Sequence, residues 1–125
     1  LAELGRNARS RTGHATVVLL FRPAECPKRM ALVELLNRLQ RRGARVEGRL
    51  MVDPHHFPGW PDLVRANGIG FPVRPIPVAR GAALAAELGY DRTPLVVVYD
   101  SLARMELATD LPEQGALAAF LEGLD

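Results

Sequence analysis

The chain has 125 residues, of which 48% are apolar and 24% are charged, the composition of an ordinary globular protein. This length fits one domain and is enough to bury a hydrophobic core. The longest apolar run, Ala15 to Phe21, is far shorter than the roughly 20 residues that a membrane-spanning helix needs. We therefore expect no membrane-spanning segment in this sequence.

The formal net charge of +2 conceals an uneven distribution along the chain. Residues 1–50 carry eleven Lys or Arg and four Asp or Glu, whereas residues 51–125 carry five and ten. Clustered arginines are one sign of nucleic-acid binding, but no aromatic residues are interleaved with them, and no helix-turn-helix or zinc-ligand spacing accompanies them. We interpret them as a solvated helix face and expect no nucleic-acid partner.

The hydrophobic pattern predicts a polar arm or short helix over 1–14, followed by a single domain over 15–125. Its elements, in chain order, are a strand over 15–21, a helix over 27–42, a strand over 46–52, a helix over 61–67, an extended proline-rich segment over 71–78, a helix over 80–88, strands over 95–99 and 104–108, and a helix over 113–124. The first strand, helix and strand form a βαβ unit, which is almost always parallel and right-handed. The sequence therefore predicts an α/β fold with a mixed four-stranded sheet and helices on both faces.

The only cysteine, Cys26, stands just after the first predicted strand, where the next helix begins. Pro27 suits the first position of a helix. Free backbone N–H groups and the helix dipole at that position lower the pKa of a thiol. Cationic neighbours in the sequence act in the same direction and Glu25 opposes them; these cations are Arg22, Lys28 and Arg29. We expect a lowered thiol pKa; the alternative is an inert thiol buried against the strand.

Four stretches in this order resemble the thioredoxin-like superfamily. They are Phe21-Arg22-Pro23-Ala24-Glu25-Cys26-Pro27-Lys28-Arg29, Val52-Asp53, Phe71-Pro72-Val73 and Thr93-Pro94-Leu95-Val96-Val97-Val98-Tyr99-Asp100. They are most similar to the extracytoplasmic thiol–disulfide oxidoreductases and the neighbouring peroxiredoxin-related proteins. The resemblance covers residues 15–124 and implies a thioredoxin-like fold.

The resemblance also implies roles for individual residues. Cys26 takes the place of the attacking cysteine, and Pro94 takes that of a cis-proline beside it. Thr93 would pair through its backbone with an extended substrate peptide, and Pro27 and Arg29 are further candidates for substrate binding. Arg29 stands where these enzymes carry their second cysteine, so Cys26 alone cannot resolve a mixed disulfide.

Three functions are compatible with this departure from the family pattern. The sequence favours thiol–disulfide exchange through Cys26, with glutathione or another protein's cysteine as the resolving thiol. A redox-inactive module that binds a protein partner is an alternative. A weak thiol peroxidase is a third, although Pro23 occupies the position where peroxiredoxins need threonine.

We expect no cofactor and no metal. His55 and His56 are adjacent, and we interpret them as loop residues. The spacing of Cys26 and Met30 resembles a copper-delivery motif, but the sequence lacks the histidine that such proteins need near the third strand. The expected partners are protein thiols or disulfides, or glutathione; the oligomeric state is left open. The family resemblance and the start at Leu1 rather than Met lead us to expect an extracytoplasmic location, periplasmic or tethered through a removed N-terminal segment, with a cytoplasmic one left open.

Overall fold

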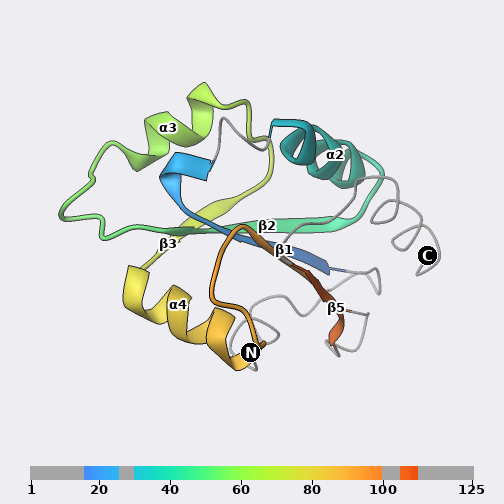
Figure 1. The fold of residues 1–125 in the computed structure, drawn as a ribbon. Helices are drawn as coiled ribbons and strands as arrows, with labels where there is room; N and C mark the ends of the chain where they lie inside the picture. The colour runs from blue at the N-terminus through green and yellow to red at the C-terminus, as the bar shows by residue number, and fades with distance from the viewer. Residues whose placement is uncertain (1–15, 26–29, 100–104, 110–125) are drawn as a thin grey trace.

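The computed structural model describes residues 16–25, 30–99 and 105–109. They include a five-stranded sheet in the order β3-β2-β1-β4-β5 (Figure 1). β1, β2 and β3 are parallel, and β4 and β5 run antiparallel to their neighbours. The strands are β1 (Thr16–Phe21), β2 (Arg45–Met51), β3 (Val73–Ile76), β4 (Leu95–Tyr99) and β5 (Met105–Thr109). The expected arm over 1–14 and the final helix over 113–124 lie outside the described residues.

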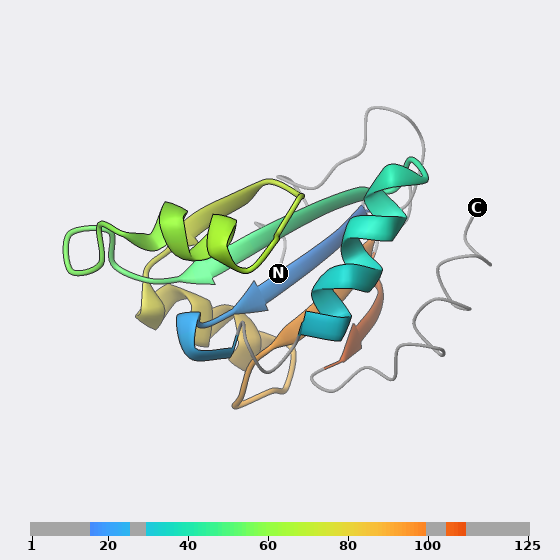
Figure 2. The same cartoon turned by 90° about the horizontal axis from the view of Figure 1, so that it is seen from above.

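Helices cover both faces of the sheet, as the sequence predicts. α2 (Met30–Arg41) and α3 (Trp60–Ala66) lie over one face, and α4 (Val78–Glu87) lies over the other (Figures 1 and 2). α2 turns its apolar stripe toward the sheet, because residues three and four apart share one helix face. The buried members of this stripe are Leu32, Val33, Leu35, Leu36 and Leu39.

β1 lies at the centre of the sheet, and both β1 and its neighbour β4 are buried along their whole lengths. Their near-continuous apolar runs are typical of strands covered on both faces. Successive side chains alternate between faces, so Val17, Leu19 and Phe21 enter the core beneath α2 and α3, whereas Val18 and Leu20 join the core beneath α4. Both strands therefore contribute side chains to the two cores that join the helices to the sheet.

β3 adds a fifth strand to the four that the sequence predicts. It lies within the segment over 71–78 that we expected to be extended but not a central strand, and among the described strands it pairs with β2 alone, at the edge of the sheet. Pro75 is compatible with this position because an edge strand can lack a ladder N–H group. The backbone N–H of Gly48 also donates to the carbonyl of Pro72 at 2.8 Å, which extends the pairing.

The end of α2 is fixed by backbone and side-chain hydrogen bonds. Gly43 has a φ of 101°, and the N–H groups of Gly43 and Ala44 donate to the carbonyls of Gln40 and Leu39. This is the Schellman pattern, which favours glycine because of its positive φ. On the same helix, Asn37 donates to the carbonyl of Gly68 and accepts the N–H of Gly70, both at 2.8 Å, and so ties α2 to the loop that follows α3.

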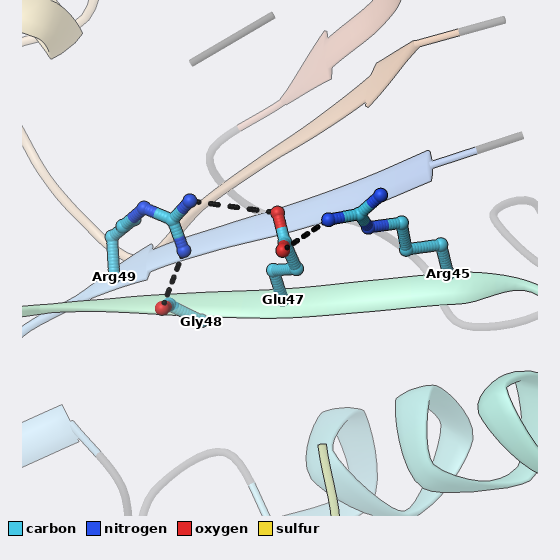
Figure 3. Close-up of polar contacts among 4 residues, drawn as sticks. All are labelled: Arg45, Glu47, Gly48 and Arg49. Carbon is cyan, nitrogen blue, oxygen red and sulfur yellow. Dashed lines mark hydrogen bonds and ion pairs between the residues drawn. The ribbon is translucent and has the colours of Figure 1, made fainter. Parts of the chain in front are cut away.

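A charged cluster stands on the opposite face of β2 from α2 (Figure 3). Arg45, Glu47 and Arg49 alternate along the strand, so their side chains share that face. Nη2 of Arg45 and Nη2 of Arg49 approach the two carboxylate oxygens of Glu47 at 3.1 and 3.4 Å. Nη1 of Arg49 also donates to the carbonyl of Gly48 at 3.1 Å. Glu47 and Arg49 are 7% and 6% exposed, so the carboxylate compensates a guanidinium that water hardly reaches.

Candidate active site

The turn that follows β1 is a short 3₁₀ helix, η1 (Pro23–Glu25). The N–H of Glu25 donates to the carbonyl of Arg22 at 3.0 Å, and the N–H of Arg22 donates to Oε1 of Glu25 at 2.6 Å. A proline at the first helical position and a glutamate at the third that reaches back to the cap N–H are both helix-start signals. They fix the path of the chain from the end of β1 to residue 25.

The loop that leads into β4 lies at the same end of the strands as this turn. β4 is antiparallel to β1, with Leu95 opposite Leu20, so β4 begins where β1 ends. The Thr93–Pro94 peptide bond just before β4 is cis, the conformation that the sequence resemblance led us to expect. Pro94 is buried and Thr93 is half-buried.

A hydrogen bond between side chains joins the turn and the loop. Oγ1 of Thr93 lies 2.9 Å from each carboxylate oxygen of Glu25. The hydroxyl carries one hydrogen, which it donates to the carboxylate. The two residues are 68 positions apart in the sequence, so the fold itself brings the residue before Cys26 against the residue before Pro94.

Three of the candidate site residues lie outside the part of the chain that the structure describes. These are Cys26, Pro27 and Arg29. The structure describes the residues on either side of them, Glu25 at the end of η1 and Met30 at the start of α2. Of the five candidates, it therefore locates Thr93 and Pro94.

Comparison with solved structures identifies the architecture. A thiol:disulfide interchange protein of the thioredoxin family from Chlorobium tepidum TLS aligns with a TM-score of 0.69 and 16% identity, over 96% of this chain and 83% of that one. A thiol-disulfide isomerase from Corynebacterium glutamicum aligns with a TM-score of 0.69 and 18% identity, over 95% and 83%. The thioredoxin domain of a thiol-disulfide oxidoreductase from Bacteroides vulgatus aligns with a TM-score of 0.70 and 9% identity, over 96% and 84%.

This chain has a thioredoxin-like fold. The sequence resemblance predicted that fold, and the comparisons confirm it. The sequence itself matches no protein-family model and no curated protein.

In this thioredoxin-like fold, Asp53 also follows a parallel strand, at the end of β2. Its Oδ1 accepts the N–H of His55 at 3.0 Å, and its Oδ2 lies 3.3 Å from Nδ1 of His56. Both histidines are exposed. Asp53 thus caps the turn after β2. Trp60 packs onto the core on the α2 side.

Neither a metal site nor a membrane span is found among the residues described. Over 16–25, 30–99 and 105–109, no three His, Cys, Asp or Glu side chains gather closely enough to hold a metal ion. In the same residues, no helix is both long and apolar enough to cross a bilayer.

The connection between Glu25 and Thr93 was not predicted from the sequence. Glu25 was interpreted only as a charge that opposes the nearby cations, although Pro23 and Glu25 carry the spacing of a helix start. That signal could have predicted the bond from Glu25 to the N–H of Arg22. The bond to Thr93 depends on the tertiary fold, and no local pattern reports it.

Proposed function

We propose that this chain carries out thiol–disulfide exchange through Cys26, with an external thiol as resolver. The observation that carries the proposal is the hydrogen bond between Glu25 and Thr93, because it links the turn before Cys26 to the loop of Thr93 and Pro94. The similar structures named thiol:disulfide interchange protein and thiol-disulfide isomerase support the same chemistry. The substrates would be protein disulfides or mixed disulfides with glutathione.

The proposed cycle begins when the Cys26 thiolate attacks one sulfur of a target disulfide. A mixed disulfide forms, the target S–S bond breaks, and the second target sulfur leaves as a thiolate that takes a proton from water. Position 29 is arginine, so no cysteine of the usual spacing attacks this adduct. An external thiolate such as glutathione displaces the target and forms a mixed disulfide with Cys26. A second one then releases the Cys26 thiolate, so two external thiols are oxidised as the target disulfide is reduced.

The remaining candidate residues would bind the substrate. In our proposal the backbone at Thr93 pairs with an extended peptide, a mode in which main-chain hydrogen bonds supply affinity and hold the target sulfur in place. In the same proposal Pro94 would pack beside Cys26, and Pro27 and Arg29 would contribute to substrate binding next to it. The cationic side chain of Arg29 would favour acidic substrates, including the carboxylates of glutathione.

The proposal is tested by single-turnover kinetics with a glutathionylated fluorescent peptide. Reduced wild-type protein should take up glutathione on Cys26 and release the peptide thiol, and added glutathione should restore the free thiol. Cys26→Ser serves as the matched control and should release no peptide. Equal release by both proteins would refute exchange through this residue.

A redox-inactive binding module is the second candidate, and Arg29 in place of a resolving cysteine favours it. Such a module would bind a protein partner through the loop of Thr93 and Pro94 or through the basic first half of the chain. In that case Cys26→Ser would keep the partner affinity and equal the wild type in every redox assay. A difference in the exchange assay decides between the two functions.

A further inference from the structure

The edge of the sheet formed by β2 and β3 gathers three arginines around a single carboxylate. Arg45, Glu47 and Arg49 share the β2 face opposite α2, where Glu47 contacts both arginines (Figure 3). Arg74 of β3 is the register partner of Arg49, and aligned residues of neighbouring strands project to the same side of a sheet. β2 and β3 therefore contribute three cations and one anion to this face, an excess of two positive charges.

Arg49 and Arg74 are unfavourable neighbours when no anion lies between them. Adjacent strands lie about 4.8 Å apart, and like charges side by side on a sheet repel each other. Arg49 is 6% exposed, so water screens its charge poorly. Glu47 already contacts Arg45 and Arg49 through its two oxygens. Arg74 is exposed and makes no hydrogen bond or ion pair within the part of the chain that the structure describes, so its charge has no counter-ion there.

Both guanidinium groups keep N–H donors that a ligand can use. A guanidinium presents its N–H groups in a planar fork that matches the oxygens of a phosphate or a carboxylate. In Arg49, Nη1 donates to the carbonyl of Gly48 at 3.1 Å and Nη2 to Glu47 at 3.4 Å. Among the described residues, no side-chain nitrogen is both sealed from solvent and without a partner. Nε of Arg49, which takes part in neither contact, therefore reaches the surface.

We propose that Arg49 and Arg74 bind a dianionic phosphate group, with Arg45 adding positive charge from farther along β2. The excess charge selects this ligand, because a phosphate monoester carries about −1.5 to −2 at neutral pH, whereas a carboxylate would neutralise only half of the excess. Glu47 and the carbonyl of Gly48 hold the guanidinium of Arg49 in place, and the exposed Arg74 closes on the phosphate from the neighbouring strand. The site uses no residue of the proposed exchange reaction and is independent of it.

Calorimetric titration of the whole chain with inorganic phosphate, at neutral pH and constant ionic strength, tests the site. The wild type should bind phosphate with a Kd of about 1 mM, and acetate at least about tenfold more weakly. Arg74→Gln should weaken phosphate binding at least about tenfold, because one of the two forks is lost. Arg38→Gln is the matched control: it removes an exposed arginine of α2, on the other face of the sheet, and should leave the affinity unchanged.

A second titration, with phenyl phosphate, identifies the source of the phosphate group. Tighter binding of phenyl phosphate assigns the site to organic monoesters, and equal or weaker binding assigns it to inorganic phosphate.

Urea denaturation of Arg74→Glu gives a further readout that needs no ligand. This change places a carboxylate beside Arg49, where we propose the phosphate lies, so the urea midpoint without phosphate should rise above that of the wild type. Added phosphate should raise the midpoint of the wild type more than that of Arg74→Glu or Arg74→Gln, because a ligand that binds only the folded state stabilises it. The proteins are compared with one another because phosphate also stabilises proteins non-specifically.

The inference is wrong if the wild type shows no saturable phosphate binding, or if Arg74→Gln and Arg38→Gln bind phosphate equally. Acetate binding as tight as phosphate binding would overturn the assignment to a dianion. A lower urea midpoint of Arg74→Glu than of wild type in phosphate-free buffer would show that Arg49 gains nothing from an anion on that side, and equal stabilisation of all these proteins by phosphate would reduce the effect to that of the salt.

Discussion

Replacing Glu47 by leucine tests the buried charged cluster of β2. Arg49 is 6% exposed, and within the part of the chain that the structure describes its guanidinium contacts Glu47 and the carbonyl of Gly48. Without the carboxylate, the Arg49 guanidinium stays buried, and the cluster no longer contains an anion to neutralise it. Removing one partner of a buried ion pair costs about 3–5 kcal/mol. We therefore expect Glu47→Leu to lower the free energy of unfolding by that amount.

The matching change on the other side of the pair should cost less. After Arg49→Met, Glu47 keeps Arg45, whose contact with it is 3.1 Å. The side chain of Arg45 is 35% exposed, so it is partly hydrated and less dependent on Glu47. A loss of about 1–2 kcal/mol follows for Arg49→Met, the size of one hydrogen bond to a charged group.

The double variant Glu47→Leu with Arg49→Met leaves no buried charge of the original pair. Replacing a whole buried pair by apolar side chains is often close to neutral, so the double variant should be at least about 2 kcal/mol more stable than Glu47→Leu alone. Urea denaturation followed by circular dichroism measures all three. If Arg49→Met proves more damaging than Glu47→Leu, or if the two losses simply add, this account of the cluster is wrong.

Three further changes probe other parts of the molecule. Gly48→Ala should destabilise the fold by about 1–3 kcal/mol, because the added Cβ would lie 2.9 Å from Cγ2 of Val73. In urea denaturation, adding Val73→Ala should recover part of this loss, and equal stability of Gly48→Ala and wild type would contradict the close packing. Burial raises the pKa of Tyr99 to about 12, so the folded state favours the neutral phenol. The free energy of unfolding should therefore fall by about 2–3 kcal/mol as the pH rises from 10 to 12. Tyr99→Phe should lack this decrease, and the same pH dependence of unfolding in wild type and Tyr99→Phe would contradict it. Arg29→Cys should form a 26–29 disulfide on mild oxidation, detected by a mass loss of about 2 Da; two free thiols after oxidation would contradict the alignment on which Cys26 is assigned.

Much of the fold follows from local patterns in the sequence. The continuous apolar runs of β1 and β4 mark them as interior strands, and the leucine spacing of α2 followed by Gly43 marks a helix and its end. β3 was harder to recognise, because prolines weaken a strand signal and its pairing with β2 depends on which edge of the sheet is open. α4 begins at Val78, two residues before its expected start, with Pro77 as its cap.

Only part of the candidate site could be predicted from local sequence patterns. Thr93 and Pro94 could be identified from a short motif before an apolar strand. The bridge from Thr93 to Glu25 could not, because it forms only when β1 and β4 pair and their ends meet. The charges of β2 likewise alternate visibly in the sequence, but their burial depends on how the rest of the chain packs over that face.

The pH dependence of Cys26 alkylation tests the central claim most directly. For a primed nucleophile, the folded protein should show a midpoint below about 8.5, the value of an ordinary thiol, and unfolding in urea should return it to that value. A midpoint above 8.5 in the folded protein, or no alkylation until the chain unfolds, would contradict the account.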